Sequence, residues 1–120
     1  MKSRYLVRTA EVPGYHPANH HHTTNQRLIG PETVGANQME VVLGTLHKGG
    51  GAHPHAHPGI EQTCYLLEGT LHIEAGREAF EMVPGDLCFF PAGTMHVVSV
   101  TSETPVKLLV FYSQPYGEAV

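Results

Sequence analysis

Positive charge is scarce in this chain, and its scarcity excludes several classes of protein. Lysine and arginine together number 7 among 120 residues, against 11 aspartates and glutamates, for a formal net charge of −4. A surface that binds nucleic acid or an anionic membrane needs clustered basic side chains. The basic residues here are scattered, and no stretch gathers them. We therefore expect neither nucleic acid nor a membrane as a partner.

Long apolar runs are also missing. No segment approaches the roughly 20 apolar residues of a membrane-spanning helix, and the first residues lack the apolar core of a signal peptide. The chain has only two cysteines, Cys64 and Cys88, in apolar strand-like runs without the spacing of a disulfide framework. These features predict reduced thiols in a cytoplasmic protein, with a disulfide between the two as the alternative.

Helical periodicity is nearly absent, because 9 prolines and 13 glycines interrupt the chain too often for a helix of several turns. Short strands separated by Gly and Pro turns are typical of an antiparallel sandwich or barrel. A chain of 120 residues is one domain. We therefore expect a single all-β domain. Its expected strands are Tyr5–Arg8, Glu40–His47, Gln62–Leu67, Thr70–Glu74, Ala79–Val83, Leu87–Phe90, His96–Val100 and Val106–Tyr112.

The first third of the chain differs from the rest, because residues 9–38 are polar and have few apolar positions. We expect this part to wrap the barrel, to lid a pocket or to cross to a partner subunit. The run His20–His22 within it is interpreted as a polar loop outside the active site. The chain then divides into an N-terminal arm and loop at 1–38, a barrel at 39–114 and a tail at 115–120.

Histidine is abundant, with 10 residues, and three of them carry a chemical signal. His55 and His57 are two apart, so on a strand their imidazoles point to the same face. His96 follows on a later expected strand, and Gln62 supplies a carboxamide between them. Two imidazoles from one strand, joined by ligands from neighbouring strands, are an ordinary way to hold a transition metal inside a barrel. His53 is interpreted as outside the ligand set, either supporting a ligand, contacting substrate or facing solvent in the entry loop.

Two motifs give these residues a family resemblance. The first, G-x5-H-x-H-x(3,4)-E-x6-G, is matched by Gly49, His55, His57, Gln62 at the glutamate position, and Gly69; the second, G-x5-P-x-G-x2-H-x3-N, by Gly85, Pro91, Gly93 and His96. Over nearly half of its length the chain thus resembles a small single-domain cupin. The resemblance implies a double-stranded β-helix, or jelly-roll, barrel with a metal held by His55, His57, Gln62 and His96.

The chain departs from this pattern at two positions. Val100 stands where the family has an asparagine that is not a ligand, and Gln62 stands where it has a glutamate ligand. Glu61 lies directly beside Gln62, and because side chains alternate along a strand only one of the two can face the metal. The spacing to Gly69 favours Gln62, and Glu61 remains the alternative. Three imidazoles and an amide are all neutral, so the ion keeps its full charge and binds anionic oxygens well.

These residues favour a metal-dependent enzyme in which a Lewis acid polarises an oxygen of a small, oxygen-rich, anionic metabolite. The resemblance implies a reaction of the isomerase, lyase or hydrolase type. Cupins with the His, His, Gln, His arrangement include small enzymes that linearise unsaturated uronates. The cofactor is expected to be one divalent transition metal ion among Zn, Ni, Fe, Mn, Co and Cu. Glu61 and Cys64 are the candidate catalytic residues. Two alternatives remain open, an Fe- or Cu-dependent dioxygenase and a non-catalytic barrel that binds a small ligand. The resemblance also predicts a homodimer.

Overall fold

The computed structural model describes residues 3–116 and shows a nearly all-β protein, as the sequence predicts. Helical structure in this range is limited to a 3-10 helix, Thr9–Glu11, and a single turn, α1, Pro31–Val34. The strands are β1 Gly14–Tyr15, β2 His20–Ile29, β3 Glu40–His55, β4 Gln62–Glu68, β5 Leu71–Ala75, β6 Glu78–Met82, β7 Leu87–Phe90, β8 His96–Val100 and β9 Val106–Tyr112.

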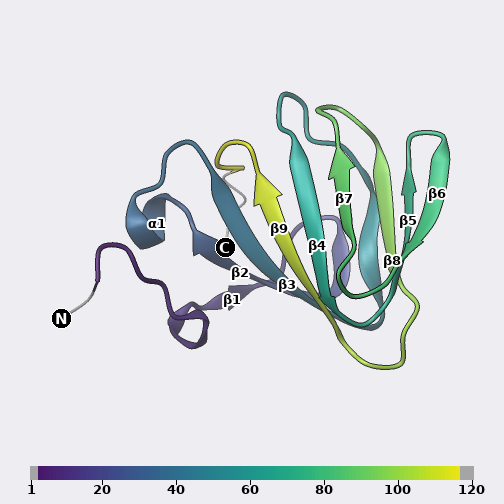
Figure 1. The fold of residues 1–120 in the computed structure, drawn as a ribbon, viewed down its shortest axis with the longest axis horizontal. Helices are drawn as coiled ribbons and strands as arrows, with labels where there is room; N and C mark the ends of the chain where they lie inside the picture. The colour runs from purple at the N-terminus through teal and green to yellow at the C-terminus, as the bar shows by residue number, and fades with distance from the viewer. Residues whose placement is uncertain (1–2, 117–120) are drawn as a thin grey trace.

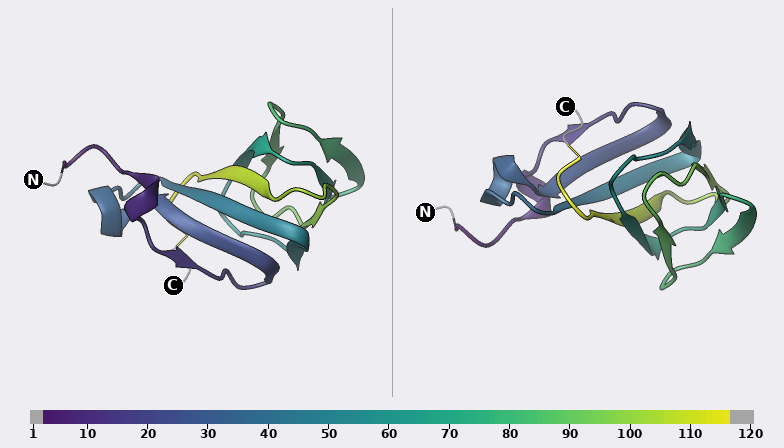
Figure 2. Two further views of the ribbon diagram at one scale, coloured as in Figure 1. Left: turned by 90° about the horizontal axis from the view of Figure 1, so that it is seen from below. Right: turned by 90° about the horizontal axis from the view of Figure 1, so that it is seen from above.

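The strands form a nearly closed antiparallel barrel (Figure 1), in the order β6-β5-β8-β3-β9-β4-β7. β2 pairs with β3 outside this path, and β1 pairs with β2. In Figure 2, β2 and β3 run side by side, while β5 and β6 lie at the end of the molecule away from the N-terminus. The topology therefore places strands that are distant in sequence next to one another around one interior.

The long strand β3 joins the two parts of the barrel. Its first half pairs with β9 and its last residues pair with β8. The change of partner falls at three consecutive glycines, Gly49–Gly51. At Gly51, with φ +154°, an added Cβ would collide with the backbone oxygen of Val98. This close approach lets the end of β3 reach β8 and carry His55 into the barrel.

The interior is filled by apolar side chains that alternate along these strands, as expected for a sheet with one buried face. Leu66, Leu71, Ile73 and Val106 are at most 1% exposed. The wider cluster adds Val42, Leu46, Ala52, Cys64, Met82, Phe90, Val98, Leu108 and Val110. These residues form the dry surroundings of the site described below.

The strand predictions differ in accuracy along the chain. Leu87–Phe90, His96–Val100 and Val106–Tyr112 are confirmed at both ends. The expected strand Tyr5–Arg8 is wrong, because these four residues have no strand structure. The expected Glu40–His47 is only the first half of β3, which continues through the glycines.

The polar segment before β3 is less loop-rich than expected. Residues 20–29 form β2, a ten-residue strand that pairs with β3 of the same chain. Its inward side chains include Thr23, Asn25 and Arg27, all buried. Because these are polar, the segment lacks the apolar alternation by which a half-buried strand is recognised. Of the expected tail 115–120, residues 117–120 lie outside the described part.

Within residues 3–116 no helix has the length and apolar character needed to cross a membrane.

The close approach at Gly51 predicts the cost of a side chain there. Gly51→Ala is expected to lower the free energy of unfolding by more than about 2 kcal/mol, because the methyl group meets the Val98 carbonyl and the backbone must leave its left-handed conformation. The measurement is urea denaturation followed by circular dichroism. Gly76→Ala is the control, since Gly76 also has a positive φ, +58°, but open space around it. Equal losses in the two variants would contradict the steric account.

Candidate metal centre

Three histidines from two strand ends meet inside the barrel. His55 is the last residue of β3 and His96 the first of β8, and the two are register partners. His57 follows β3 in the next loop. One ligand nitrogen from each of the three residues lies within 4.8 Å of the others. The ring centroids of His55 and His96 are 4.3 Å apart, and those of His55 and His57 are 4.9 Å apart.

Backbone carbonyls orient two of these rings. His55 Nδ1 lies 2.7 Å from the oxygen of His53, and His96 Nδ1 lies 3.0 Å from the oxygen of Thr94. A carbonyl only accepts, so in each pair Nδ1 carries the hydrogen and Nε2 keeps its lone pair. Metal-binding histidines in proteins are commonly held in this way. The residue His53, outside the ligand set in the sequence interpretation, thus supports His55 through its backbone.

Several polar atoms of the cluster are buried without a hydrogen-bond partner within residues 3–116. They are both ring nitrogens of His57, Nε2 of His96 and Oε1 of Gln62. Leaving a buried polar atom unsatisfied costs about 1–3 kcal/mol, so folded proteins rarely tolerate a group of them. A bound metal ion accepts lone pairs of this kind, and this donor set fits one.

Burial also fixes the charge of the cluster. Removal from water, followed by the repulsion of neighbouring imidazoles, lowers the pKa of His57 and of His96 to about 4. Phe90 stacks on His96 with the rings 4.2 Å apart and 7° from parallel, and so contributes to this dry environment. At neutral pH both imidazoles are uncharged, which is the form that binds a metal.

The alternation along β4 decides which of two adjacent side chains faces the cluster. Gln62 is 7% exposed and lines the same cavity as His55 and His96, whereas Glu61 is exposed and outside it. Nε2 of Gln62 donates to Cys64 Sγ at 3.2 Å. The amide oxygen is therefore the atom of Gln62 left to meet an ion.

The candidate catalytic residue Cys64 lies on the floor of this cavity. It is directly opposite Cys88 on β7, and both are free thiols. The hydrogen bond with Cys88, together with burial, raises the pKa of Cys64. Cys64 is thus held as a neutral thiol and a partner of Gln62, which is poor preparation for a nucleophile. Glu61, the other candidate, does not line the cavity.

The cavity itself is small, at about 40 Å³. Such a volume holds one or two water molecules. Besides the residues already named, its polar walls come from His20, Thr23, Asn25 and Tyr112, and its other walls are apolar. Among the described residues, no Asp, Glu, Lys or Arg lines it. Sequence reasoning missed His20 and Tyr112, since neither stands in the cupin motifs.

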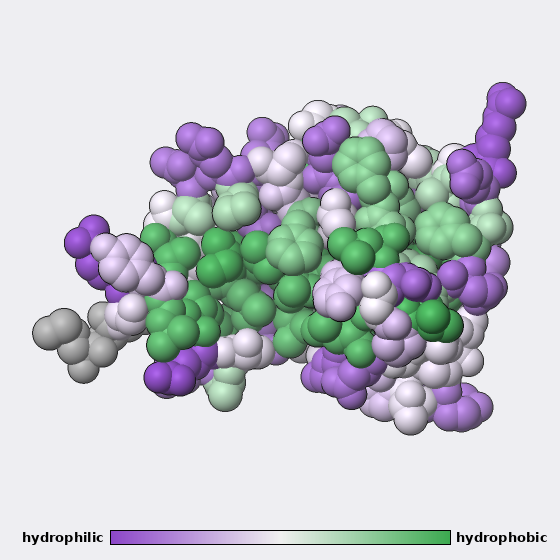
Figure 3. All heavy atoms as spheres, viewed as in Figure 1, coloured by the Kyte–Doolittle hydropathy of each residue, from purple (hydrophilic) through white to green (hydrophobic). Residues whose placement is uncertain are grey.

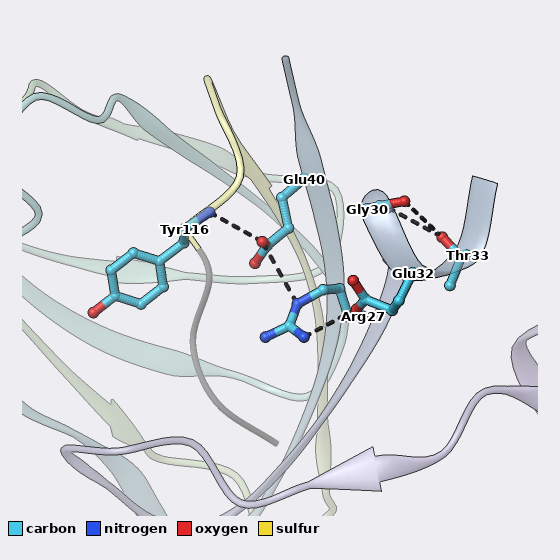
Figure 4. A network of polar contacts seen from close by, with 6 residues as sticks. All are labelled: Arg27, Gly30, Glu32, Thr33, Glu40 and Tyr116. Atoms are coloured by element: carbon cyan, nitrogen blue, oxygen red, sulfur yellow. Dashed lines mark hydrogen bonds and ion pairs between the residues drawn. The ribbon is translucent and has the colours of Figure 1, made fainter. Parts of the chain in front are cut away.

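The C-terminal segment covers one side of the cluster. The ring of Tyr116 lies edge-on to His57, with centroids 4.4 Å apart. The backbone nitrogen of Tyr116 donates to Glu40 Oε1 at 3.0 Å, and the Arg27 guanidinium lies 3.5 Å from the same oxygen (Figure 4). Arg27 is also paired with Glu32 at 2.9 Å. This buried network fixes the segment that packs on His57, and no sequence motif pointed to it.

Comparisons with known proteins agree with this architecture. Solved structures similar to it include the polyketide cyclase RemF from Streptomyces resistomycificus, at 25% identity and TM-score 0.79 over 100% of this chain and 82% of that one. A predicted oxalate decarboxylase from Thermotoga maritima has 20% identity and TM-score 0.80 over 92% and 99%. KdgF from Halomonas sp. has 17% identity and TM-score 0.76 over 92% and 95%.

The fold and the histidine cluster define a small barrel of the jelly-roll type. The cupin domain model matches residues 42–112, more than half of the chain, and the chain belongs to the cupin family. Among curated proteins, an uncharacterized protein of Methanocaldococcus jannaschii is 32% identical over 63 residues, or 52% of this chain. The match spans 50% of that protein's length. The predicted family and fold are thereby confirmed.

The lowered pKa values predict that acid destabilises the metal-free protein. Between pH 6.5 and about 4 the unfolded chain binds protons at His57 and His96 while the folded chain does not. The contribution of these two residues to the free energy of unfolding is therefore complete above pH 6.5 and is lost as the pH falls toward 4. We expect the melting temperature, measured by calorimetry after chelation, to drop over this range. A His57→Gln/His96→Gln variant should show a shallower drop, and an equal drop would contradict the assignment.

Proposed function

We propose that this protein is a metal-dependent enzyme in which His55, His57, His96 and Gln62 hold one divalent transition metal ion. The observation that carries the proposal is that one ligand nitrogen from each of the three histidines lies within 4.8 Å of the others. In the described residues, both ring nitrogens of His57, Nε2 of His96 and Oε1 of Gln62 are also buried without a hydrogen-bond partner. When bound, the ion would supply a Lewis acid for an oxygen of the substrate. The metal could be Zn, Ni, Fe, Mn, Co or Cu, because imidazole and amide ligands suit all of them.

The charge of the cavity favours an oxygen-rich, anionic substrate. The four proposed ligands are neutral, and no acidic side chain among the described residues lines the cavity. The positive charge of an ion there would remain uncompensated until an anionic oxygen arrives. The cavity of about 40 Å³ admits the oxygen-bearing end of a small molecule, and its size limits the number of water molecules beside it. The chain's own residues thus orient the ligands and leave little room for water.

The comparison with RemF supports chemistry at a carbonyl or enol oxygen. RemF is a polyketide cyclase, and the match at 25% identity covers 100% of this chain and 82% of RemF. Polyketides carry carbonyl and enol oxygens, which are the groups that a Lewis acid polarises. We therefore favour an isomerase, lyase or related reaction at such an oxygen over activation of dioxygen.

This choice predicts that turnover proceeds unchanged when the reaction is run under nitrogen. Turnover that requires oxygen would contradict it.

We also propose that the protein forms a homodimer through the outer face of the sheet. Apolar residues gather on the face seen in Figure 3, over β3, β9, β4 and β7 in the orientation of Figure 1. The register sets them side by side, since Tyr65 lies between Leu87 and Leu109, and Phe111 lies beside Val41. Leu87 and Phe89 are 64% and 53% exposed. An apolar face of this extent is typical of a protein–protein interface.

The ligand assignment predicts opposite results for two adjacent residues. Gln62→Ala is expected to weaken metal binding by at least about 10-fold, because it removes a ligand from the cavity. Glu61→Ala should leave binding unchanged, since Glu61 faces solvent. The measurement is metal affinity by competition with a chromophoric chelator, with metal content checked by mass spectrometry. If Glu61→Ala weakened metal binding more than Gln62→Ala did, Glu61 would be the ligand. Wild-type protein that retains less than about 0.1 equivalent after loading and dialysis would reject the metal centre.

The dimer proposal is tested by light scattering. The wild type is expected at twice the 13.1 kDa mass of the chain. A Leu87→Asp/Phe89→Asp variant should be monomeric, because in a two-fold dimer each charge is introduced twice. Val83→Asp is the control, since Val83 is 52% exposed but lies in the turn after β6. A monomeric wild type, or a dimer that both variants retain, would contradict the proposed face.

A further inference from the structure

A fourth imidazole reaches the cavity from a strand that the cupin motifs do not include. His20, the first residue of β2, lines the cavity together with His55, Gln62 and His96. The ring centroids of His20 and His55 are 5.4 Å apart. His20 does not belong to the set of residues whose donor atoms all lie within 4.8 Å of one another. It therefore stands beside the proposed ligands without joining them.

The register between β2 and β3 leaves His20 facing inward. It shifts between His21 and Thr23, where residues 47–50 of β3 stand against His22 alone, and His22 takes a positive φ of 50°. His20 is opposite Ala52 and Thr23 is opposite Leu46, and all four residues line the cavity. Cross-strand partners share a face of the sheet, so His20 and Thr23 both point to the cavity although they are three residues apart. The preceding turn is fixed as well, since Asn19 has φ 60° and its oxygen accepts from the His53 nitrogen at 2.7 Å. Bulges that re-aim a side chain are frequent next to functional sites.

The ring of His20 is oriented like the rings of two proposed ligands. Its Nδ1 lies 2.6 Å from the oxygen of Ala18, two residues earlier. In His55 and His96, too, Nδ1 lies beside the carbonyl oxygen of the residue two positions earlier. That residue is His53 for His55 and Thr94 for His96. In all three rings the hydrogen is on Nδ1 and the lone pair on Nε2. His20 in this neutral form can accept a further hydrogen bond but has no second hydrogen to donate.

The neighbours of His20 in the sequence have other surroundings. The ring of His21 lies against His53, with centroids 4.7 Å apart, and His22 is exposed. Neither lines the cavity. Of the three consecutive histidines, only His20 is therefore placed to contact a molecule bound at the proposed metal centre.

We propose that His20 is a substrate-contact residue whose Nε2 accepts a hydrogen bond from a hydroxyl group next to the oxygen that the metal binds. The proposal rests on the proposed function and deepens it, because it names the substrate class: hydroxylated or enolised carbonyl and carboxyl compounds. A bare carboxylate has no hydrogen to offer to His20. The ion selects an anionic oxygen, and His20 selects the adjacent hydroxyl.

The experiment compares two small probes that differ by one hydroxyl group. Glycolate and acetate are titrated into the Co(II)-loaded protein, and binding is followed by the visible absorption of the ion. His20→Leu removes the acceptor at similar volume, His20→Gln retains an acceptor, and His22→Asn is the control on the same strand. Asn tolerates the positive φ of that position. Affinity for Co(II) is measured for every variant before the probes are added.

We expect His20→Leu to weaken glycolate binding by about 5- to 10-fold, the effect of one hydrogen bond, and to leave acetate binding unchanged. His20→Gln should recover part of the loss, and His22→Asn should match the wild type. Equal glycolate and acetate affinities in wild type, or the same ratio in wild type and His20→Leu, would overturn the role of His20 while the metal centre stands. A Co(II) affinity at least about 10-fold weaker in His20→Leu would also overturn it, by making His20 a ligand. Wild-type protein that binds no Co(II) would reject the proposed function itself.

Discussion

The structure depends on placing neutral imidazoles in an apolar interior with their lone pairs facing one another. Burial holds the pKa of His57 and His96 near 4, so both rings stay uncharged at neutral pH. Their buried nitrogens without hydrogen-bond partners in the described residues therefore carry a free-energy cost. The backbone carbonyls of His53 and Thr94 use the Nδ1 hydrogens, which leaves Nε2 directed elsewhere. The arrangement is costly without an ion, and under the proposed function a bound ion would offset that cost. Metal binding would then couple the stability of the barrel to the proposed chemistry.

Several features of the fold follow from the need to assemble this cluster. The glycines of β3 allow the strand to pass from β9 to β8, which brings His55 opposite His96. The register shift between β2 and β3 goes with the placing of His20 opposite Ala52 in the same cavity. The network of Arg27 and Glu40 holds Tyr116 against His57, which lies outside that cavity. Strand irregularities thus bring His55 and His20 to the cavity, and a buried ion pair holds the segment that packs on His57.

The barrel strands could be predicted from the sequence because they are short apolar runs with Gly or Pro close to at least one end. β7, β8 and β9 are of this kind. β2 is not, since its buried residues are polar and its register with β3 shifts at His22. For the site, the spacing to Gly69 favoured Gln62 over Glu61, and the structure has Gln62 buried and Glu61 exposed. The positions of His20 and Tyr116 depend on a register shift between strands and on long-range packing, which no local sequence pattern records.

X-ray absorption spectroscopy of the zinc-loaded wild-type protein tests the central claim most directly. Three histidines and one amide oxygen predict a shell of light atoms at about 2.0–2.2 Å with the outer scattering typical of imidazole. The same site predicts no sulfur, because Cys64 is held as a neutral thiol beside Gln62. A sulfur shell at about 2.3 Å, or a spectrum without imidazole scattering, would contradict the account.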